Sequence, residues 1–158
     1  MWWLNIQWPY TTNKYSIMKT LFIRSLSWCY ADLASLVLRI SFGILMIPHG
    51  YFKLTNFDEI VGEFMNFLGM GSTASLWLVI VVEIFCSVLL IIGLVTRLAI
   101  IPLLITAIVI VFVAHHGDIF GEAAGGFYYL LAYTAILLLG SGKYSVDYLI
   151  GRRRVIRK

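Results

Sequence analysis

The residue whose type and position most directly indicate chemistry is Glu83, a carboxylate inside the apolar run 75–95. This run is long enough to cross a bilayer, because about 20 residues at 1.5 Å each cover a hydrocarbon core of about 30 Å. An ionised acid at that depth is costly unless it is protonated, paired or hydrated. The sequence therefore predicts that Glu83 carries a proton or has a cationic partner.

The candidate partner is Arg39, which lies in the earlier apolar run 33–52. A rise of 1.5 Å per residue puts the Cα atoms of Arg39 and Glu83 at depths that differ by roughly 9 Å, which two long side chains can bridge. Three hypotheses are open for Glu83: an ion pair that fixes helix register, a relay for protons such as those of a quinol, and a protonated, unpaired acid. For the relay, the candidate proton-handling residues are Glu83, Arg39 and His49.

A second group of ionisable side chains falls near the outer membrane surface in the predicted topology. Its members are His49, His115, His116, Asp118 and Glu122. Three interpretations are open: a transition-metal site, a cluster that accepts protons near neutral pH, and ordinary interfacial residues. Because the His-His-x-Asp spacing fits no standard zinc motif, we assign no metal ligand.

Candidate ligand-binding residues are Lys53, His115, His116, Tyr129 and Tyr133. Lys53 either extends its ammonium to the membrane surface or anchors an anionic ligand. The tyrosines, with Tyr128, either pack at the membrane interface or stack on a quinone ring.

Composition predicts a membrane protein. Of 158 residues, 61% are hydrophobic and only 13% are charged, whereas soluble domains carry about a quarter charged residues. The mean hydropathy is +0.90, and the length allows one domain. Cys29 and Cys86 form no Cys-x-x-Cys pair, which argues against a dithiol oxidoreductase.

Four apolar runs predict an all-α integral membrane bundle of four transmembrane helices. We expect an interfacial arm over residues 1–32, with a short helix at 17–30, then the bundle over 33–150, and a basic tail over 151–158. The expected transmembrane helices cover residues 33–52, 75–95, 98–114 and 127–140.

Small and polar residues share one face of the first expected helix, which should therefore point at other helices. They are Arg39, Gly43, Met46, Gly50 and Lys53. In the connection 55–73, the apolar spacing predicts an amphipathic helix on the membrane surface. After the fourth run, Gly140 is expected to stop the helix, with Ser145 or Asp147 capping a short tail helix.

The charge distribution predicts the orientation. The N-terminal arm, the turn at Arg97 and the C-terminal tail are basic, whereas the first and third connections are acidic. By the positive-inside rule both termini are cytoplasmic, and four crossings satisfy this parity. The N-terminus lacks the pattern of a cleavable signal peptide. The first 17 residues either belong to the native product or precede a start at Met18.

Several pieces together resemble the DoxX family over residues 36–147. They are Leu38-Arg39 with Gly43, His49-Gly50-x-x-Lys53, Glu83, Ile91-Ile92-Gly93-Leu94-x-Thr96-Arg97, and Gly140-Ser141-Gly142-Lys143-Tyr144-Ser145-Val146-Asp147. Two departures are Ser141, where the family usually has Pro, and Tyr128, where many members carry a carboxylate. The resemblance implies a four-helix inner-membrane bundle. Some members are linked to thiosulfate:quinone oxidoreduction or membrane redox complexes, and many have no defined activity.

Two classes of function follow, with a third as the weaker alternative. The first is the membrane subunit of a quinone-linked or stress-related redox complex, which would use a cavity between the first two expected helices. Because the sequence has no haem, flavin or iron–sulfur motif, a partner protein would supply the electron carrier. The second is a scaffold that recruits partner enzymes, and the third is a small-solute transporter. Expected partners are the lipid bilayer, a redox protein and a second copy of the chain. Nucleic acid is not expected, since the positive-inside rule accounts for the basic tail.

Overall fold

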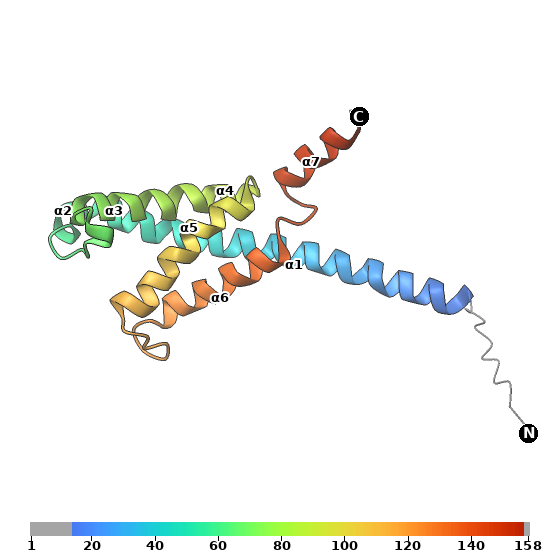
Figure 1. The fold of residues 1–158 in the computed structure, drawn as a ribbon, viewed down its shortest axis with the longest axis horizontal. Coiled ribbons are helices and arrows are strands. Elements are labelled where there is room, and N and C mark those ends of the chain that lie inside the picture. The colour runs from blue at the N-terminus through green and yellow to red at the C-terminus, as the bar shows by residue number, and fades with distance from the viewer. Residues whose placement is uncertain (1–13, 157–158) are drawn as a thin grey trace, which may run out of the picture. The chain divides into compact units, whose positions relative to one another are not determined.

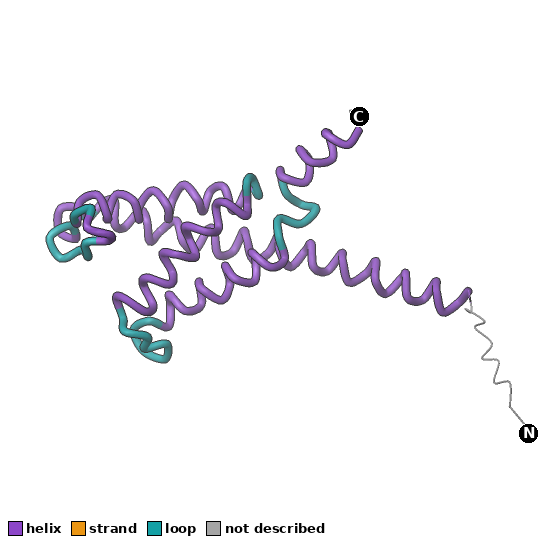
Figure 2. Tube along the Cα trace, in the orientation of Figure 1, coloured by secondary structure: helices purple, strands orange, loops and turns teal. Residues whose placement is uncertain are grey.

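The computed structural model describes the backbone of residues 14–156 and the side chains of residues 30–152. Within this range every regular element is a helix, which confirms the all-α prediction (Figures 1 and 2). The chain divides into two compact units, residues 1–30 and 31–158. All contacts described below belong to the second unit. The expected interfacial side chains of the arm and the last basic residues of the tail lie outside the described side chains.

The helices follow the apolar runs closely. They are α1 (Lys14–Thr55), the continuous series α3 (Ser72–Val81), η2 (Val82–Cys86) and α4 (Ser87–Ile92), the pair α5 (Thr96–Ile108) and η3 (Val109–Ala114), α6 (Ala124–Leu139) and α7 (Val146–Ile156). The segments η2 and η3 are π-helical. The helix expected at 17–30 does not end before the first apolar run. It is part of α1, because neither glycine nor proline interrupts the sequence between Lys14 and Gly43.

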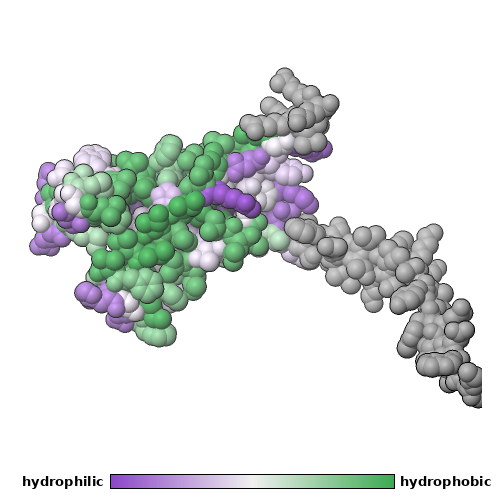
Figure 3. Space-filling view, in the orientation of Figure 1, coloured by the Kyte–Doolittle hydropathy of each residue, from purple (hydrophilic) through white to green (hydrophobic). Residues whose placement is uncertain are grey.

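Three helical segments within the described residues are long and apolar enough to cross a membrane: Tyr30–Thr55, Ser72–Ile92 and Thr96–Ala114. Helix α6 is apolar but shorter. Figure 3 shows apolar surface over the helices, with polar residues gathered toward the connections. Such a surface is stable only in lipid, so the fold is a helical membrane bundle.

Residues from α1, α4, α5 and α6 form one core: Met46, Leu90, Ile100, Leu103, Ala107, Tyr133 and Ile136. Glycines on α1 allow the continuous series α3, η2 and α4 (the second helical series) to approach closely. A Cβ on Gly43 would lie 2.5 Å from Ile91 Cγ1, and one on Gly50 would lie 2.7 Å from Ile84 Cγ1. The small face of α1 therefore points at neighbouring helices, as its spacing predicted.

The connection after α1 differs from the amphipathic helix predicted there. It contains α2 (Phe57–Ile60) and a single 3-10 turn, η1 (Phe67–Gly69), with non-helical backbone between them. Leu68 and Gly69, at the end of this turn, have left-handed φ values of 54° and 76°, so no right-handed helix continues through them. The side chain of Ser75 accepts a hydrogen bond from Phe67 N at 2.9 Å and so folds the connection onto α3.

Candidate functional site

The buried acid is paired with a lysine. Lys53 Nζ lies 2.6 Å from Glu83 Oε1 and 2.7 Å from Oε2, so the ammonium donates to both carboxylate oxygens. The side chain of Glu83 is 1% exposed and that of Lys53 is 21% exposed. The prediction that Glu83 has a cationic partner is confirmed, but the prediction that Arg39 is this partner is wrong.

The register of α1 against the helix that carries Glu83 explains why Lys53, and not Arg39, is the partner. Glu83 lies level with Gly50, because a Cβ on Gly50 would be 3.1 Å from Glu83 Cβ. Lys53 follows Gly50 by one turn on the same face, whereas Arg39 precedes it by about 16 Å along the helix axis. The sequence suggested otherwise because the apolar run ends at Phe52, while helix α1 continues to Thr55 and carries Lys53 into the bundle.

Arg39 lies at the opposite end of the bundle and is fully buried. Its Nη2 donates to Tyr144 O at 2.9 Å and its Nη1 to Leu90 O at 3.4 Å. Arg39 therefore joins α1 to α4 and to the segment that follows α6. This geometry assigns it a structural role at that end.

Asp147, in the segment that follows α6, holds this segment at the same end of the bundle by capping α5. Asp147 accepts hydrogen bonds from Val95 N at 2.7 Å and Thr96 N at 2.9 Å, at the start of α5. Its own N–H donates to Gly93 O at 3.0 Å. Of the two residues proposed as caps for the tail helix, Ser145 has that role, because its Oγ accepts from Tyr148 N at 3.2 Å. Asp147 instead satisfies the first amides of α5.

Three aromatic rings form a row from the surface of α1 into the core. His49, which is exposed, packs edge-on against Tyr129 with ring centroids 5.7 Å apart, and Tyr129 packs against Tyr133 at 5.8 Å. Tyr133 is fully buried. His49 directly precedes Gly50 on α1, and Gly50 lies level with Glu83. The structure therefore brings together five of the predicted site residues: Glu83, Lys53, His49, Tyr129 and Tyr133.

The remaining predicted residues, His115 and His116, lie apart from this cluster in the connection between η3 and α6. His115 Nδ1 lies 3.6 Å from Glu122 Oε2, and His116 is exposed. Across the part of the chain with described side chains, no three His, Cys, Asp or Glu residues gather closely enough to hold a metal ion. The metal interpretation therefore has no geometric support here.

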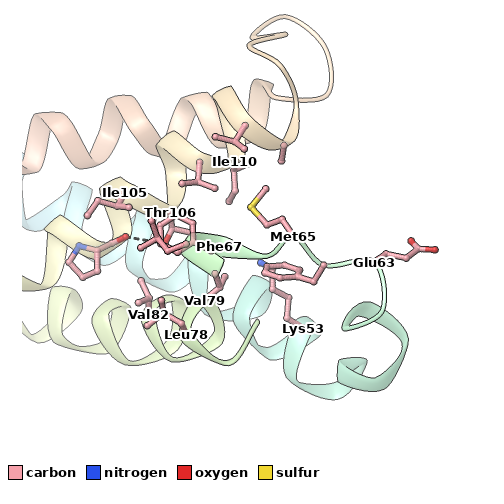
Figure 4. Close-up of a pocket in the computed structure, with 16 residues that line it drawn as sticks. Lys53, Glu63, Met65, Phe67, Leu78, Val79, Val82, Ile105, Thr106 and Ile110 are labelled. Carbon is pink, nitrogen blue, oxygen red and sulfur yellow. Dashed lines mark hydrogen bonds between the residues drawn. The ribbon is translucent and has the colours of Figure 1, made fainter. Parts of the chain in front are cut away.

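An apolar cavity of about 730 Å³ adjoins the ion pair, and Lys53 forms part of its wall. The other walls come from α3, α5, the two π-helical segments and the connection after α1. They include Phe64, Met65, Phe67, Leu78, Val79, Val82, Ile105, Thr106, Val109 and Ile110. Figure 4 shows the lining side chains around one space, with the labelled Glu63 carboxylate directed away from it.

The π-helical segments widen the helices where the site is built. Glu83 lies in η2, and five residues of η2 and η3 line the cavity: Val82, Val109, Ile110, Val113 and Ala114. A π-helical turn inserts an extra residue, rotates the following side chains and recurs at functional sites. A mostly apolar cavity with a few fixed polar groups is also the usual form of a small-molecule site.

A family model described as DoxX matches residues 34–116, which is more than half of the chain. The chain belongs to the DoxX family. The matched region contains Arg39, His49, Lys53 and Glu83, and ends before α6. Comparisons with curated proteins and with solved structures gave no significant match.

In this DoxX protein, sequence reasoning missed the pairing of Lys53 with Glu83. It expected a cavity between the first two transmembrane helices, whereas most of the cavity wall comes from α3, α5, η3 and the connection after α1. One signal was available for the pairing: Lys53 lies on the same small, polar face of α1 as Gly50. For the position of the cavity no comparable signal existed. Phe64 and Phe67 have helical spacing, yet they enter the cavity because the backbone turns between them.

Proposed function

We propose that the protein binds a quinone in the apolar cavity and exchanges the protons of the quinol through Glu83. It would do so as the membrane subunit of a redox complex. The observation that carries the proposal is that one residue, Lys53, both lines the cavity and holds the buried carboxylate.

The chemistry of the residues agrees with that role. The apolar walls suit a quinone ring and its isoprenoid tail, and the Lys53 ammonium is a donor for a ring carbonyl. Reduction of a quinone consumes two electrons and two protons. Glu83 can carry one proton at a time. When Glu83 is protonated, its negative charge is lost, and Lys53 is then free to turn toward the ligand. The electrons come from a cofactor of a partner protein.

Quinone binding can be measured directly with decylubiquinone as the probe and the purified protein in nanodiscs. Val79→Trp places a large ring in the cavity and should weaken binding about tenfold or more, as expected for overpacking of a filled site. The matched control is Val88→Trp, because Val88 lies on the same helical series but outside the cavity. Equal affinity in the two variants would contradict the proposed site. Absence of quinone binding together with a co-purifying soluble enzyme would favour the scaffold alternative.

We also propose that the chain crosses the bacterial inner membrane four times, with both termini in the cytoplasm. The basic turn at Arg97 and the segment before α7 lie at one end of the bundle, since Asp147 contacts Gly93, Val95 and Thr96. Positive charge at that end favours the cytoplasmic side.

Reporter fusions test this topology. Alkaline phosphatase, which is active only outside the cytoplasm, should be active when fused after Gly62 or Gly117. Green fluorescent protein fused after Lys158 should fluoresce, because it folds in the cytoplasm. The reverse pattern would contradict the proposed orientation.

A further inference from the structure

The cavity beside Lys53 lies between two helical series that spread apart. A tight turn joins α4 to α5, and α5 packs against α4 and η2. Beyond η2 the helices diverge, so that in Figure 1 the start of α3 and the far end of the α5 and η3 pair are well separated. Both α3 and α5 supply walls of the cavity. The cavity therefore occupies the wedge between two diverging helices.

One rim of this wedge is formed by α5. Ile101, Ile105 and Ile108 recur at steps of four and three, so they share one face of the helix. All three side chains are exposed, as expected for a face that contacts lipid. Of the three, only Ile105, which is 47% exposed, also lines the cavity. The cavity therefore reaches the lipid-facing surface of the bundle at Ile105.

The opposite rim is formed by the second helical series. Trp77 and Val81 are exposed and lie on a face that does not line the cavity, whereas Val79 and Val82 do line it. Each residue turns the helix by about 100°, which places Leu78 between these two groups. Leu78 is 44% exposed and also lines the cavity. Leu78 and Ile105 are therefore the rim residues on the two sides of one opening.

This opening lies at the depth of the hydrocarbon core. Leu78 and Ile105 are interior residues of the spans Ser72–Ile92 and Thr96–Ala114. Along the helix axes, Leu78 lies about 9 Å from the start of its span, and Ile105 about 13.5 Å from the start of its own. A molecule dissolved in the bilayer can reach an opening at this depth, whereas a water-soluble molecule would first have to enter the hydrocarbon core.

The cavity has a polar group at Lys53 and apolar residues at its opening. Its volume of about 730 Å³ suits a drug-sized molecule, so the isoprenoid chain of a membrane quinone would extend beyond it. We propose that the cavity opens into the lipid between Leu78 and Ile105. Its ligand is a long-tailed quinone whose ring lies at Lys53 and whose tail leaves through this opening. The inference rests on the quinone site proposed above and specifies the route of entry.

Photolabelling from the lipid tests the opening without any quinone. Wild-type protein is placed in phosphatidylglycerol nanodiscs that contain a phospholipid with a diazirine in its acyl chain, and labelled residues are mapped by mass spectrometry after irradiation. Val79, inside the cavity, should be labelled together with the exposed Trp77. Leu90, which is fully buried on the same helical series, should not. Labelling of Val79 no greater than that of Leu90 would overturn the proposal.

A matched pair of variants locates the point of entry. Ile105→Trp places a large ring at the opening and should reduce the labelling of Val79 severalfold. Ile101→Trp adds the same ring one turn away, outside the cavity, and should leave the labelling of Val79 unchanged. Labelling of Trp77 should be the same in both variants, which shows that each is folded and inserted. Equal labelling of Val79 in the two variants would overturn the proposed route.

Competition by a quinone separates this inference from the proposed function. Ubiquinone-10, added to the nanodiscs, should reduce the labelling of Val79 severalfold and leave that of Trp77 unchanged. If decylubiquinone binds but ubiquinone-10 does not protect Val79, the long tail does not leave through this opening, and the inference fails while the proposed function stands. If neither quinone binds, the proposed function fails, and the ligand named here fails with it.

Discussion

Replacing Lys53 by Met should lower the free energy of unfolding by about 3–5 kcal/mol, and adding Glu83→Gln should recover most of the loss. In the single variant a carboxylate with a 1% exposed side chain keeps its burial and loses both hydrogen bonds from Nζ. In the double variant no charge remains. Reversible unfolding in mixed detergent micelles measures both changes.

An ion pair whose lysine is exposed gives the matched control for this prediction. Lys143 Nζ lies 3.3 Å from Asp32 Oδ2, and the side chain of Lys143 is 56% exposed. Lys143→Met should therefore cost at most about 1 kcal/mol. The same Glu83→Gln change should give no recovery when it is combined with Arg39→Met, since Arg39 contacts backbone carbonyls instead. Recovery with Arg39→Met, and none with Lys53→Met, would restore the pairing first expected from sequence.

The second large effect concerns the turn between α4 and α5, where Gly93→Ala should cost about 2–5 kcal/mol. Gly93 ends α4 with φ at 74°, a conformation that alanine adopts only with strain. In addition, an added Cβ would overlap the Arg39 guanidinium and crowd Ser145. The substitution therefore strains the backbone and displaces the side chain that joins three segments.

Two other glycines separate the backbone strain from the effect of contact with Arg39. Gly69 also has a positive φ, of 76°, but a Cβ there would meet nothing within 4 Å. Gly69→Ala should therefore show the backbone strain alone, at about 1–2 kcal/mol. Gly62 has neither feature, so Gly62→Ala should change stability by less than about 0.5 kcal/mol. Equal losses in Gly93→Ala and Gly69→Ala would show that contact with Arg39 contributes nothing.

Most of the fold follows from the length of the apolar runs. The second, third and fourth helical segments lie close to the residues expected from their runs, since about 20 apolar residues have few alternatives to a helix in lipid. The connection after α1 could not be predicted in the same way. Its path depends on a hydrogen bond from Phe67 N to Ser75, which requires the connection and α3 to be folded together.

The candidate site was predicted in its residue types and only partly in its contacts. Sequence reasoning selected Glu83 because a lone acid in an apolar helix needs compensation. It also named Lys53, which binds the acid, and the ring row formed by His49, Tyr129 and Tyr133. It assigned the wrong cation, because apolar runs mark where lipid contact ends and do not fix the register of one helix against another.

By itself the sequence determined that this protein is an all-α membrane bundle of the DoxX type with a buried acid that must be compensated. These properties depend on local composition and on the cost of burying a charge, and both can be judged from the sequence without knowing any tertiary contact. Tertiary structure alone decided that Lys53 is the partner, that Arg39 fastens the opposite end, and that a cavity adjoins the ion pair. The reason is geometric: glycines on α1 set how far the helices slide past one another, and that register decides which side chains meet.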